Sequence, residues 1–369
     1  MSILFSPLDL GPVRAPNRIA IAPMCQYSAN DGCASDWHLQ QVMNYAMSGA
    51  GVVTLEATGV TREGRISHGC LGLYSDECEY ALARVLQAAR AVAMPDTKFS
   101  IQLGHAGRKG STHKNWDGGG SLLTHESAWR TCAPSSLPYA ANWHVPAAMD
   151  EAEIERTIDA FGRAAARAAR IGFDMVELHA AHGYLIHQFH SPISNKRTDA
   201  WGGDPQGRLR FPLAVAEAVR AATPTHMAVG ARITGTDYIE GGLTVEDAVD
   251  MARGFKTRGL DYVCVSSGNI IAGGRPASGP GFNVPNAAKV RAEAGIVTRT
   301  AGFIADAHQA EAIVSEGGVD QVALARAFLD DPRWGWHAAE KLGVTLPLPK
   351  QYNRVAPKAW PGVKIARPS

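Results

Sequence analysis

The sequence lacks the features that mark membrane proteins, secreted proteins and polyanion binders. It contains no run of about 18 apolar residues, so we expect no membrane-spanning helix. The N-terminus has no basic leader before an apolar core, so we expect no signal peptide and a cytoplasmic protein. Lys and Arg total 36 against 35 for Asp and Glu, without a run of like charges. This balance argues against nucleic acid as a partner.

Paired cysteines are also missing. The six cysteines are scattered along the chain, and none forms a C-x-x-C motif. This spacing argues against a zinc knuckle, an iron–sulfur cluster and a dithiol redox centre, so we expect free thiols.

What the sequence does have is a regular alternation of short apolar runs and longer amphipathic segments. The apolar runs are nearly continuous, as expected for strands buried on both faces. Eight of them with helical segments between predict an α/β fold of the TIM (β/α)₈ barrel type. A doubly wound open sheet is the alternative, but the Gly-rich dinucleotide turn that it needs near its first strand is absent. The predicted strands are Arg18–Pro23, Gly51–Glu56, Lys98–Gly104, Phe173–His179, Met227–Ile233, Asp261–Ser266, Ile296–Thr300 and Val319–Ala323.

Helix signals support this reading and set the domain boundaries. Asp150–Arg170 has an N-cap at Asp150 and a stop at Gly172, and similar segments are Gln206–Ala221, Thr244–Arg258 and Asp306–Glu316. We expect one barrel over residues 1–345. Residues 110–146, which are rich in glycine and aromatics, interrupt the alternation after the third strand and are predicted to cap the barrel mouth. Residues 346–369 form either a disordered end or an arm that reaches another subunit.

Because TIM-barrel sites lie at the carboxyl ends of the strands, the polar residues there are the candidates. His179, His182 and Tyr184 leave the fourth strand together. Two imidazoles can donate to one substrate oxygen while a phenol supplies a proton. A zinc site using H-x-x-H and a backbone-capping role for one histidine are about as probable on this motif alone.

Two further strand ends carry cationic candidates. Arg232 ends the fifth strand and needs an anion, either a charged cofactor ring, which we favour, or a carboxylate in an internal salt bridge. Gly302 and Arg326 follow strands seven and eight, where this fold binds phosphate, although an ordinary turn with a surface arginine is nearly as probable. A helix beginning near Asp306 is expected to add dipole support to that phosphate site.

Cys25 and Tyr27 follow the first strand directly. A free cysteine in this position is more often a small buried residue than a soft thiol beside a redox cofactor. Tyr27 either donates a hydrogen bond or packs.

These residues carry a family pattern. The segments Asn17–Tyr27, Gln102, His105–Lys109, Gly172–Leu185, Ser191–Gly203 and Asp331–Pro332 together resemble the Old Yellow Enzyme family of NADH:flavin oxidoreductases. The likeness runs from about the fifth residue to Tyr352. Cys25 is typical of the bacterial thermophilic-like/xenobiotic reductase subclass. This chain departs from the pattern at Gly207, where asparagine is frequent, and at Ala325, where glycine is common.

The resemblance implies roles for individual residues. The ring of FMN would be surrounded, and its phosphate held, by Pro23, Met24, Cys25, Ala57, Gln102, Arg232, Gly302, Phe303, Ala325 and Arg326. His179 and His182 would bind the substrate oxygen, with Tyr184 as proton donor and Tyr27 and Lys109 lining the pocket. Gln351–Arg354 resembles the tail that related enzymes insert into a neighbouring subunit, which makes Arg354 a candidate contact in a homo-oligomer such as a dimer or tetramer.

The predicted function is therefore FMN-dependent ene-reduction. NADPH or NADH would reduce FMN, which would pass hydride to the β-carbon of an α,β-unsaturated carbonyl or nitro compound by a ping-pong mechanism, without a metal. A zinc-dependent barrel hydrolase using His179 and His182 is the alternative from another class. A relative with an iron–sulfur cluster is disfavoured because no cysteine follows Cys264, and a non-catalytic scaffold because so many polar groups converge on one face.

Overall fold

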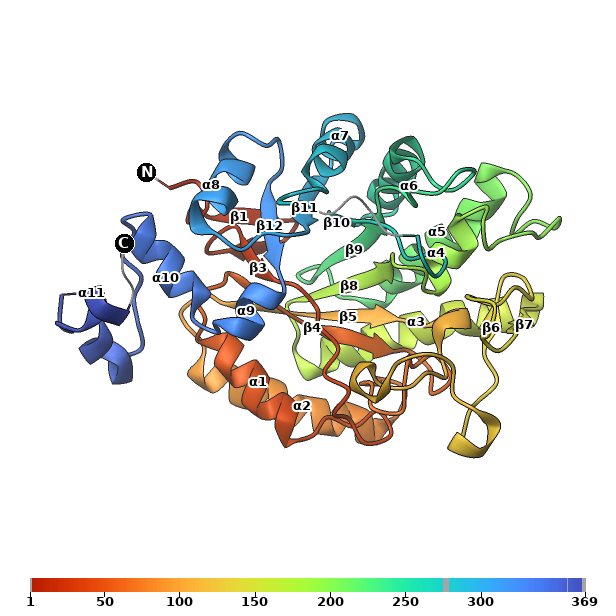
Figure 1. Cartoon of the computed structure of the whole chain (residues 1–369), viewed down its shortest axis with the longest axis horizontal. Coiled ribbons are helices and arrows are strands. Elements are labelled where there is room, and N and C mark those ends of the chain that lie inside the picture. Colours follow the sequence, from red (N-terminus) through yellow and green to blue (C-terminus); the bar gives the residue numbers. More distant parts are fainter. Residues whose placement is uncertain (1, 275–278, 357, 367–369) are drawn as a thin grey trace.

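Eight parallel strands pair edge to edge and close on themselves in the computed structural model, which describes residues 2–274, 279–356 and 358–366 (Figure 1). Each predicted strand overlaps an observed one, and β12 closes the barrel by pairing Val322 with Ile19 of β3. This confirms the TIM (β/α)₈ fold. The barrel strands are β3 (Ile19–Ile21), β4 (Val52–Gly59), β5 (Lys98–Gly104), β8 (Met175–Ala180), β9 (Ala228–Thr234), β10 (Tyr262–Ser266), β11 (Val297–Ala301) and β12 (Gln321–Leu324).

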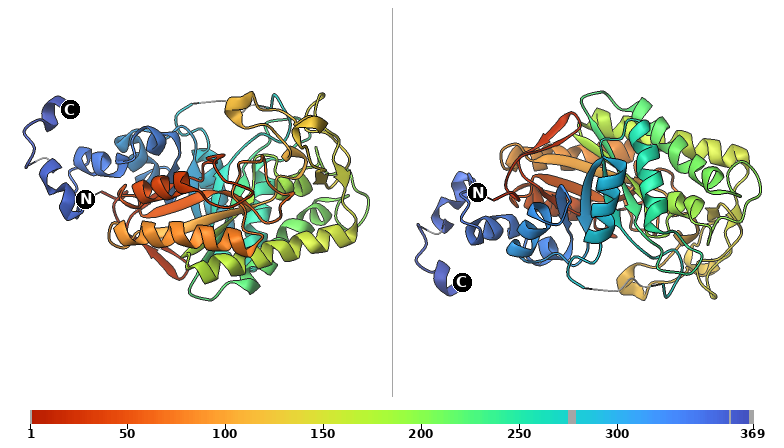
Figure 2. Two further views of the ribbon diagram at one scale, coloured as in Figure 1. Left: turned by 90° about the horizontal axis from the view of Figure 1, so that it is seen from below. Right: turned by 90° about the horizontal axis from the view of Figure 1, so that it is seen from above.

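Helices surround this barrel on its outer side (Figures 1 and 2). They bury an outer apolar layer against the strands, whereas a smaller inner cluster fills the barrel together with the hairpin β1 (Leu8–Leu10) and β2 (Val13–Ala15). The helices are α1 (Asp36–Ala46), α2 (Asp76–Val92), α3 (Glu151–Ile171), α4 (Leu185–His190), α5 (Pro205–Ala222), α6 (Val245–Thr257), α7 (Val284–Ala294), α8 (Ala307–Ser315), α9 (Arg326–Asp330) and α10 (Trp334–Lys341).

Local capping explains where these helices begin and end. The Asp150 side chain accepts the Glu153 N–H at the start of α3, and Gly172 ends the helix at a φ of 95°, in the left-handed region that favours glycine. Thr244 and Asp247 form a capping box at the start of α6. The four predicted helices are therefore present, with ends within a residue or two of the expected ones.

The segment over residues 110–146 follows β5 and the short helix η1 (Gly107–Lys109). It contains the short helices η2 (Asn115–Asp117) and η3 (Thr124–Glu126) and the strand β6 (Cys132–Ala133), which pairs with β7 (Ala147–Ala148). The Trp116 and Tyr27 rings pack edge to face, with centroids 5.5 Å apart. Tyr139 lies 4.6 Å from the Lys109 ammonium. The segment thus contacts residues beyond the ends of β3 and β5.

The C-terminal residues lie at the opposite end of the molecule from this segment in all three views (Figures 1 and 2). They include η4 (Lys350–Val355) and α11 (Val363–Ala366). Tyr352 packs against Trp336 of α10 and accepts a hydrogen bond of 2.9 Å from Arg333. In the part of the chain that the structure describes, no helix has the length and apolar character needed to cross a membrane.

Candidate active site

Sheet register brings the candidate residues together at the carboxyl ends of neighbouring strands. Ala57 of β4 lies opposite Gln102 of β5, and His179 of β8 lies opposite Arg232 of β9. Gln102 is in turn opposite Glu177 of β8. These side chains come from four consecutive strands of the barrel, so residues far apart in sequence share one face.

His179, His182 and Tyr184 form one cluster where β8 leads into α4. The ring centroid of His179 lies 5.2 Å from that of His182 and 4.6 Å from that of Tyr184. His182 adopts a φ of 57°, which turns the chain sharply between the two histidines. Nδ1 of His179 is buried and has no hydrogen-bond partner among the described residues. An unsatisfied ring nitrogen at a strand end fits a ligand-binding role.

Burial, with a smaller contribution from neighbouring charges, keeps this cluster neutral. Burial lowers the pKa of both histidines well below 6.5, and the neighbouring charges of Arg232 and Lys109 lower it further. Burial also raises the pKa of Tyr184 well above its ordinary value, so the phenol keeps its proton at neutral pH. Neutral imidazoles can donate hydrogen bonds, and the phenol can supply a proton.

A second buried pair supports this loop from behind. The Gly183 N–H donates to Nδ1 of His187 on α4 at 2.8 Å, so the ring proton is on Nε2. Nε2 lies 2.9 Å from Oδ1 of Asp237, and both side chains are fully buried. Burial alone would raise the pKa of Asp237, but His187, together with hydrogen bonds from Leu243 and Ser191, lowers it. Sequence reasoning missed this pair because its members lie 50 positions apart.

Lys109 joins the loop after β5 to the His182 loop. Its Nζ donates to the His182 carbonyl oxygen at 2.7 Å and lies 4.9 Å from the Tyr184 ring centroid. Burial, with a smaller contribution from the charge of Arg108, lowers the pKa of Lys109 to about 7. Lys109 therefore lies beside the cluster of His179, His182 and Tyr184.

Arg232 has no carboxylate partner among the described residues, which removes the internal salt bridge as an explanation. Its Nη2 lies 3.4 Å from Ser266 Oγ, and its buried Nε has no partner among those residues. Ser266, at the end of β10, also contacts His182 Nε2 at 2.6 Å. It therefore links Arg232 of β9 to the loop after β8. Sequence reasoning did not select Ser266. A partly buried guanidinium with a buried, unpartnered Nε and no counter-ion fits an anionic ligand.

Gln102 is oriented by the polar layer beneath it. Its Nε2 donates to Glu177 Oε1 at 2.8 Å, so its carbonyl oxygen is turned away from Glu177. Glu177 also lies 3.2 Å from Arg299 Nη1. Because the three side chains are almost fully buried, this network fixes which end of the Gln102 amide is available for a ligand.

Pro23, Met24 and Cys25 follow β3 directly and continue into Tyr27, whose φ is 50°. A hydrogen bond with Cys70 and burial raise the pKa of the Cys25 thiol well above its ordinary value, so it is protonated. Burial raises the pKa of the Tyr27 phenol as well. The loop therefore presents neutral groups to the barrel mouth.

The loops after β11 and β12 lie side by side, since Ala301 pairs with Ala323. Gly302 has a φ of 139°, and a Cβ there would lie 2.7 Å from the Phe282 ring, so a glycine is required. Phe303 is 53% exposed, and its ring lies 5.4 Å from the Arg326 guanidinium. Ala325 immediately precedes α9, so these four residues form a loop pair that presents the exposed guanidinium of Arg326.

The helix predicted to begin near Asp306 is present as α8, and the protein itself caps its first turn. Asp306 is the N-cap of α8, and its own carboxylate accepts the N–H groups of His308 and Gln309. Those donors are therefore engaged by the protein itself. The helix that begins in the loop pair is α9, which starts at Arg326.

Arg354 lies on η4 and is exposed. The C-terminal residues project from the end of the molecule opposite residues 110–146 (Figure 1), so nothing in the single chain brings Arg354 to the cluster described above.

Taken together, the fold and the strand-end residues define a barrel enzyme with a cationic mouth, a neutral histidine pair and a loop pair suited to phosphate. Within the described residues, no group of three or more His, Cys, Asp or Glu side chains could hold a metal ion.

Comparison with known proteins identifies the family. Residues 3–344 match the NADH:flavin oxidoreductase / NADH oxidase family. The chain belongs to this family, which is the Old Yellow Enzyme family, and is an FMN-dependent NAD(P)H oxidoreductase. This assignment replaces the zinc-hydrolase alternative.

Two curated relatives match almost end to end. The chain is 40% identical over 358 residues to the NADPH dehydrogenase of Geobacillus sp. (strain WCH70), covering 96% of this chain and 98% of that protein. It is 39% identical over 362 residues to the NADPH dehydrogenase of Listeria innocua, covering 98% of this chain and all of that protein.

Solved structures show the same barrel. Morphinone reductase aligns with a TM-score of 0.76 at 28% identity, over 94% of this chain and 91% of that protein. A 2-naphthoyl-CoA reductase complex aligns with a TM-score of 0.82 at 25% identity over 92% of this chain. This chain spans about half (52%) of the length of that reductase.

The residues present fit FMN. Arg232 is a partly buried cation whose buried Nε has no partner among the described residues, as an anionic ring would require. The paired loops at Gly302 and Arg326 combine close backbone approach with a guanidinium, as a phosphate would require.

Proposed function

We propose that this protein is an ene-reductase, which uses NADPH or NADH to reduce the activated double bond of an α,β-unsaturated carbonyl or nitro compound. The observation that carries the proposal is the clustering of His179, His182 and Tyr184 beside Arg232. Bound FMN supplies the hydride chemistry and carries electrons from the nicotinamide to the acceptor.

In this proposal, Pro23, Met24, Cys25, Ala57, Gln102 and Arg232 surround the flavin ring, and Gly302, Phe303, Ala325 and Arg326 hold its phosphate. Arg232 compensates negative charge on the ring, because no carboxylate neutralises it among the described residues. Gln102 offers its carbonyl oxygen to a ring N–H, since Glu177 engages its amide nitrogen.

His179 and His182 bind the carbonyl or nitro oxygen of the acceptor. Both imidazoles are neutral, so they stabilise the developing negative charge as hydrogen-bond donors rather than as cations. A donor of this kind typically contributes about 3 kcal/mol in the transition state. The bound oxygen orients the double bond so that its β-carbon is the position reduced.

Tyr184 delivers a proton to the α-carbon of the acceptor. Its pKa is raised, so the phenol donates only once that carbon has become strongly basic. Tyr27 and Lys109 line the substrate pocket, and the segment over residues 110–146 helps to exclude water there. In a homo-oligomer, Arg354 of a neighbouring subunit would reach the same pocket.

The test is a spectrum of the purified protein, followed by anaerobic titration with NADPH and NADH and turnover on a panel of cyclic enones and nitroalkenes. We expect flavin absorption near about 450 nm, bleaching by a nicotinamide and reoxidation by the acceptors. Saturated ketones of the same shape serve as the control. If a nicotinamide reduces the flavin but no enone or nitroalkene reoxidises it, the ene-reductase proposal is contradicted. The assignment as a flavin oxidoreductase would still hold.

Tyr184→Phe separates the two chemical roles. It keeps the ring packing against His179 but removes the proton donor. We expect slower reduction of enones, whose α-carbon must be protonated, and nearly unchanged reduction of the enzyme by the nicotinamide. Equal losses in both half-reactions would contradict the assigned role.

A further inference from the structure

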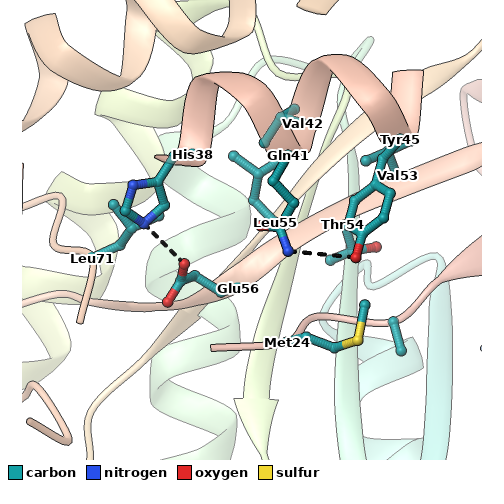
Figure 3. A pocket seen from close by; sticks show the side chains of 11 residues that line it. Met24, His38, Gln41, Val42, Tyr45, Val53, Thr54, Leu55, Glu56 and Leu71 are labelled. Atoms are coloured by element: carbon teal, nitrogen blue, oxygen red, sulfur yellow. Dashed lines mark hydrogen bonds and ion pairs between the residues drawn. The ribbon is translucent and has the colours of Figure 1, made fainter. Parts of the chain in front are cut away.

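A second buried His–carboxylate pair lies outside the groups that the mechanism uses. His38 of α1 and Glu56 of β4 face each other behind the Met24–Tyr27 loop, and Figure 3 shows the two side chains directed toward one another across a small pocket lined by both elements. Their side chains are only 2% exposed. A buried carboxylate is costly unless it is paired, so its retention at the barrel mouth requires an explanation.

An irregularity in β4 puts Glu56 there. Leu55 pairs with Ile101 and Ala57 with Gln102, so Glu56 is one extra residue in β4. Val53 and Leu55 belong to the outer apolar layer. Regular alternation would direct Glu56 into the barrel and Ala57 toward the helices. The bulge instead directs Glu56 toward α1 and places Ala57 opposite Gln102.

The contacts of Glu56 tie it to the loop after β3. Oε2 accepts the N–H of Gln26 at 3.0 Å, and Oε1 lies 3.1 Å from His38 Nε2. Nδ1 of His38 accepts the Ser35 N–H at 3.0 Å, so the imidazole proton is on Nε2. Both carboxylate oxygens therefore face N–H groups, an arrangement that suits the ionised form. Burial raises the pKa of Glu56, and these two donors oppose that rise.

The same loop is held on its other side by its own side chain. Gln26 Nε2 donates to the Met24 carbonyl oxygen at 2.8 Å, and Gln26 Oε1 accepts from Trp37 Nε1 at 2.9 Å. Trp37 and His38 both lie in the first turn of α1. Cys25 lies between these anchored positions, so its place depends on the contacts of Gln26 and Glu56.

Cys25 also senses the charge of Glu56. The groups that face its thiol are the hydrogen-bonded Cys70, the Glu56 carboxylate and the backbone N–H of Ala57. Cys70 and burial raise the pKa of Cys25 most, Glu56 raises it further, and the Ala57 N–H lowers it.

We propose that Glu56, oriented by His38, is a positioning residue that anchors the Cys25 loop and holds a fixed negative charge behind it, which lowers the reduction potential of the flavin. The inference rests on the proposed placement of Cys25 beside the flavin ring. A fixed negative charge disfavours the addition of electrons to a nearby group. Its removal therefore favours the reduced flavin.

The test compares the midpoint potential of bound FMN in the wild-type holoenzyme and in Glu56→Gln. The amide keeps the size of the side chain and an oxygen for the Gln26 N–H, but loses the charge. We expect the ratio of reduced to oxidised flavin at a fixed potential to rise about tenfold, which is about 30 mV for a two-electron couple. Asp237→Asn is the matched control, because it removes a buried charge from the loop on the other side of the site. We expect it to leave the potential unchanged.

A second measurement does not depend on the flavin. The rate of Cys25 alkylation by iodoacetamide is compared in the same proteins, with Cys25→Ser versions subtracting the other thiols. Loss of the nearby negative charge favours the thiolate, so Glu56→Gln should react faster. If Glu56→Gln does not fold, His38→Leu, whose side chain has no donor for Oε1, is measured in its place and should also alter both values.

The outcomes separate this inference from the proposed function. An unchanged potential together with unchanged alkylation overturns the inference, whatever happens to activity or stability. Faster alkylation without a change in potential would mean that the flavin is not close to Cys25. That result overturns both the effect of Glu56 on the flavin potential and the predicted contact between Cys25 and the flavin ring. A shift in both values supports the positioning and the electrostatic role of Glu56.

Discussion

Two loops of the active site are each held by a buried histidine paired with a buried carboxylate. The pairs differ in which member contacts the loop: a carboxylate at one loop and an imidazole at the other. Behind the Cys25 loop, the carboxylate of Glu56 accepts the backbone N–H and His38 stands behind it. Behind the His182 loop, the imidazole of His187 accepts the backbone N–H and Asp237 stands behind it.

The order of the pair decides which charge the loop experiences. At the Cys25 loop the negative group is in direct contact with the chain, so position and electrostatics are coupled. At the His182 loop a neutral ring nitrogen makes the contact, and the negative charge is held farther back by the N–H of Leu243 and the hydroxyl of Ser191. We infer that the first pair tunes a redox group, whereas the second only fixes geometry.

The largest expected effect tests whether the His182 side of the site serves the acceptor rather than the flavin. His179→Ala removes a donor to the substrate oxygen, so oxidation of the reduced enzyme by an enone should slow by about 10²–10³-fold. Affinity for phenolic ligands should fall, with little loss of FMN. Stopped-flow absorbance and ligand titration measure both, and His308→Ala on the exposed side of α8 is the control. Loss of bound flavin in His179→Ala would mean that His179 binds the flavin rather than the acceptor.

An intermediate effect is expected for the support of the His182 loop. Asp237→Asn leaves His187 with a neutral partner in a fully buried position, and we expect about 2–3 kcal/mol of lost stability. KM for the acceptor should rise because the loop loses its fixed position. Thermal unfolding and steady-state kinetics provide the measurements. Asp250→Asn, at an exposed pair with Arg253, is the matched control and should change little. A flavin potential that moves in Asp237→Asn as much as in Glu56→Gln would abolish the contrast between the pairs.

The smallest effect concerns pH. An unperturbed imidazole with a pKa near 6.5 would be mostly protonated at pH 6, but the pKa values of His179 and His182 are lowered, so both rings stay neutral through this range. The affinity for a neutral cyclic ketone should therefore show no histidine titration between about pH 6 and 8. Lys109, with a pKa lowered to about 7, is the group that can titrate there. Any pH dependence of the affinity should disappear in Lys109→Gln; its persistence in that variant would assign it to the histidines instead.

The strands could be predicted from sequence because each is buried on both faces and therefore reads as a short apolar run between turns. The strand-end rule of this fold then grouped His179, Gln102 and Arg232 correctly, since register follows from the closed barrel. The buried pairs could not be predicted, because Glu56 and Asp237 are recognisable only once their partners on other elements are known. The start of α8 near Asp306 was predicted, but a sequence does not reveal that the Asp306 carboxylate accepts N–H groups of its own helix.

The extra residue in β4 also limits how this enzyme can be altered. Deleting Ala57 would restore regular alternation and turn the Glu56 carboxylate into the interior of the barrel, whereas deleting Glu56 would remove the carboxylate altogether. Lengthening or shortening the loops on either side would leave that alternation unchanged. Changes of length are therefore tolerated in the loops. The length of β4 is constrained, because one extra residue must lie between Leu55, which pairs with Ile101, and Ala57, which pairs with Gln102.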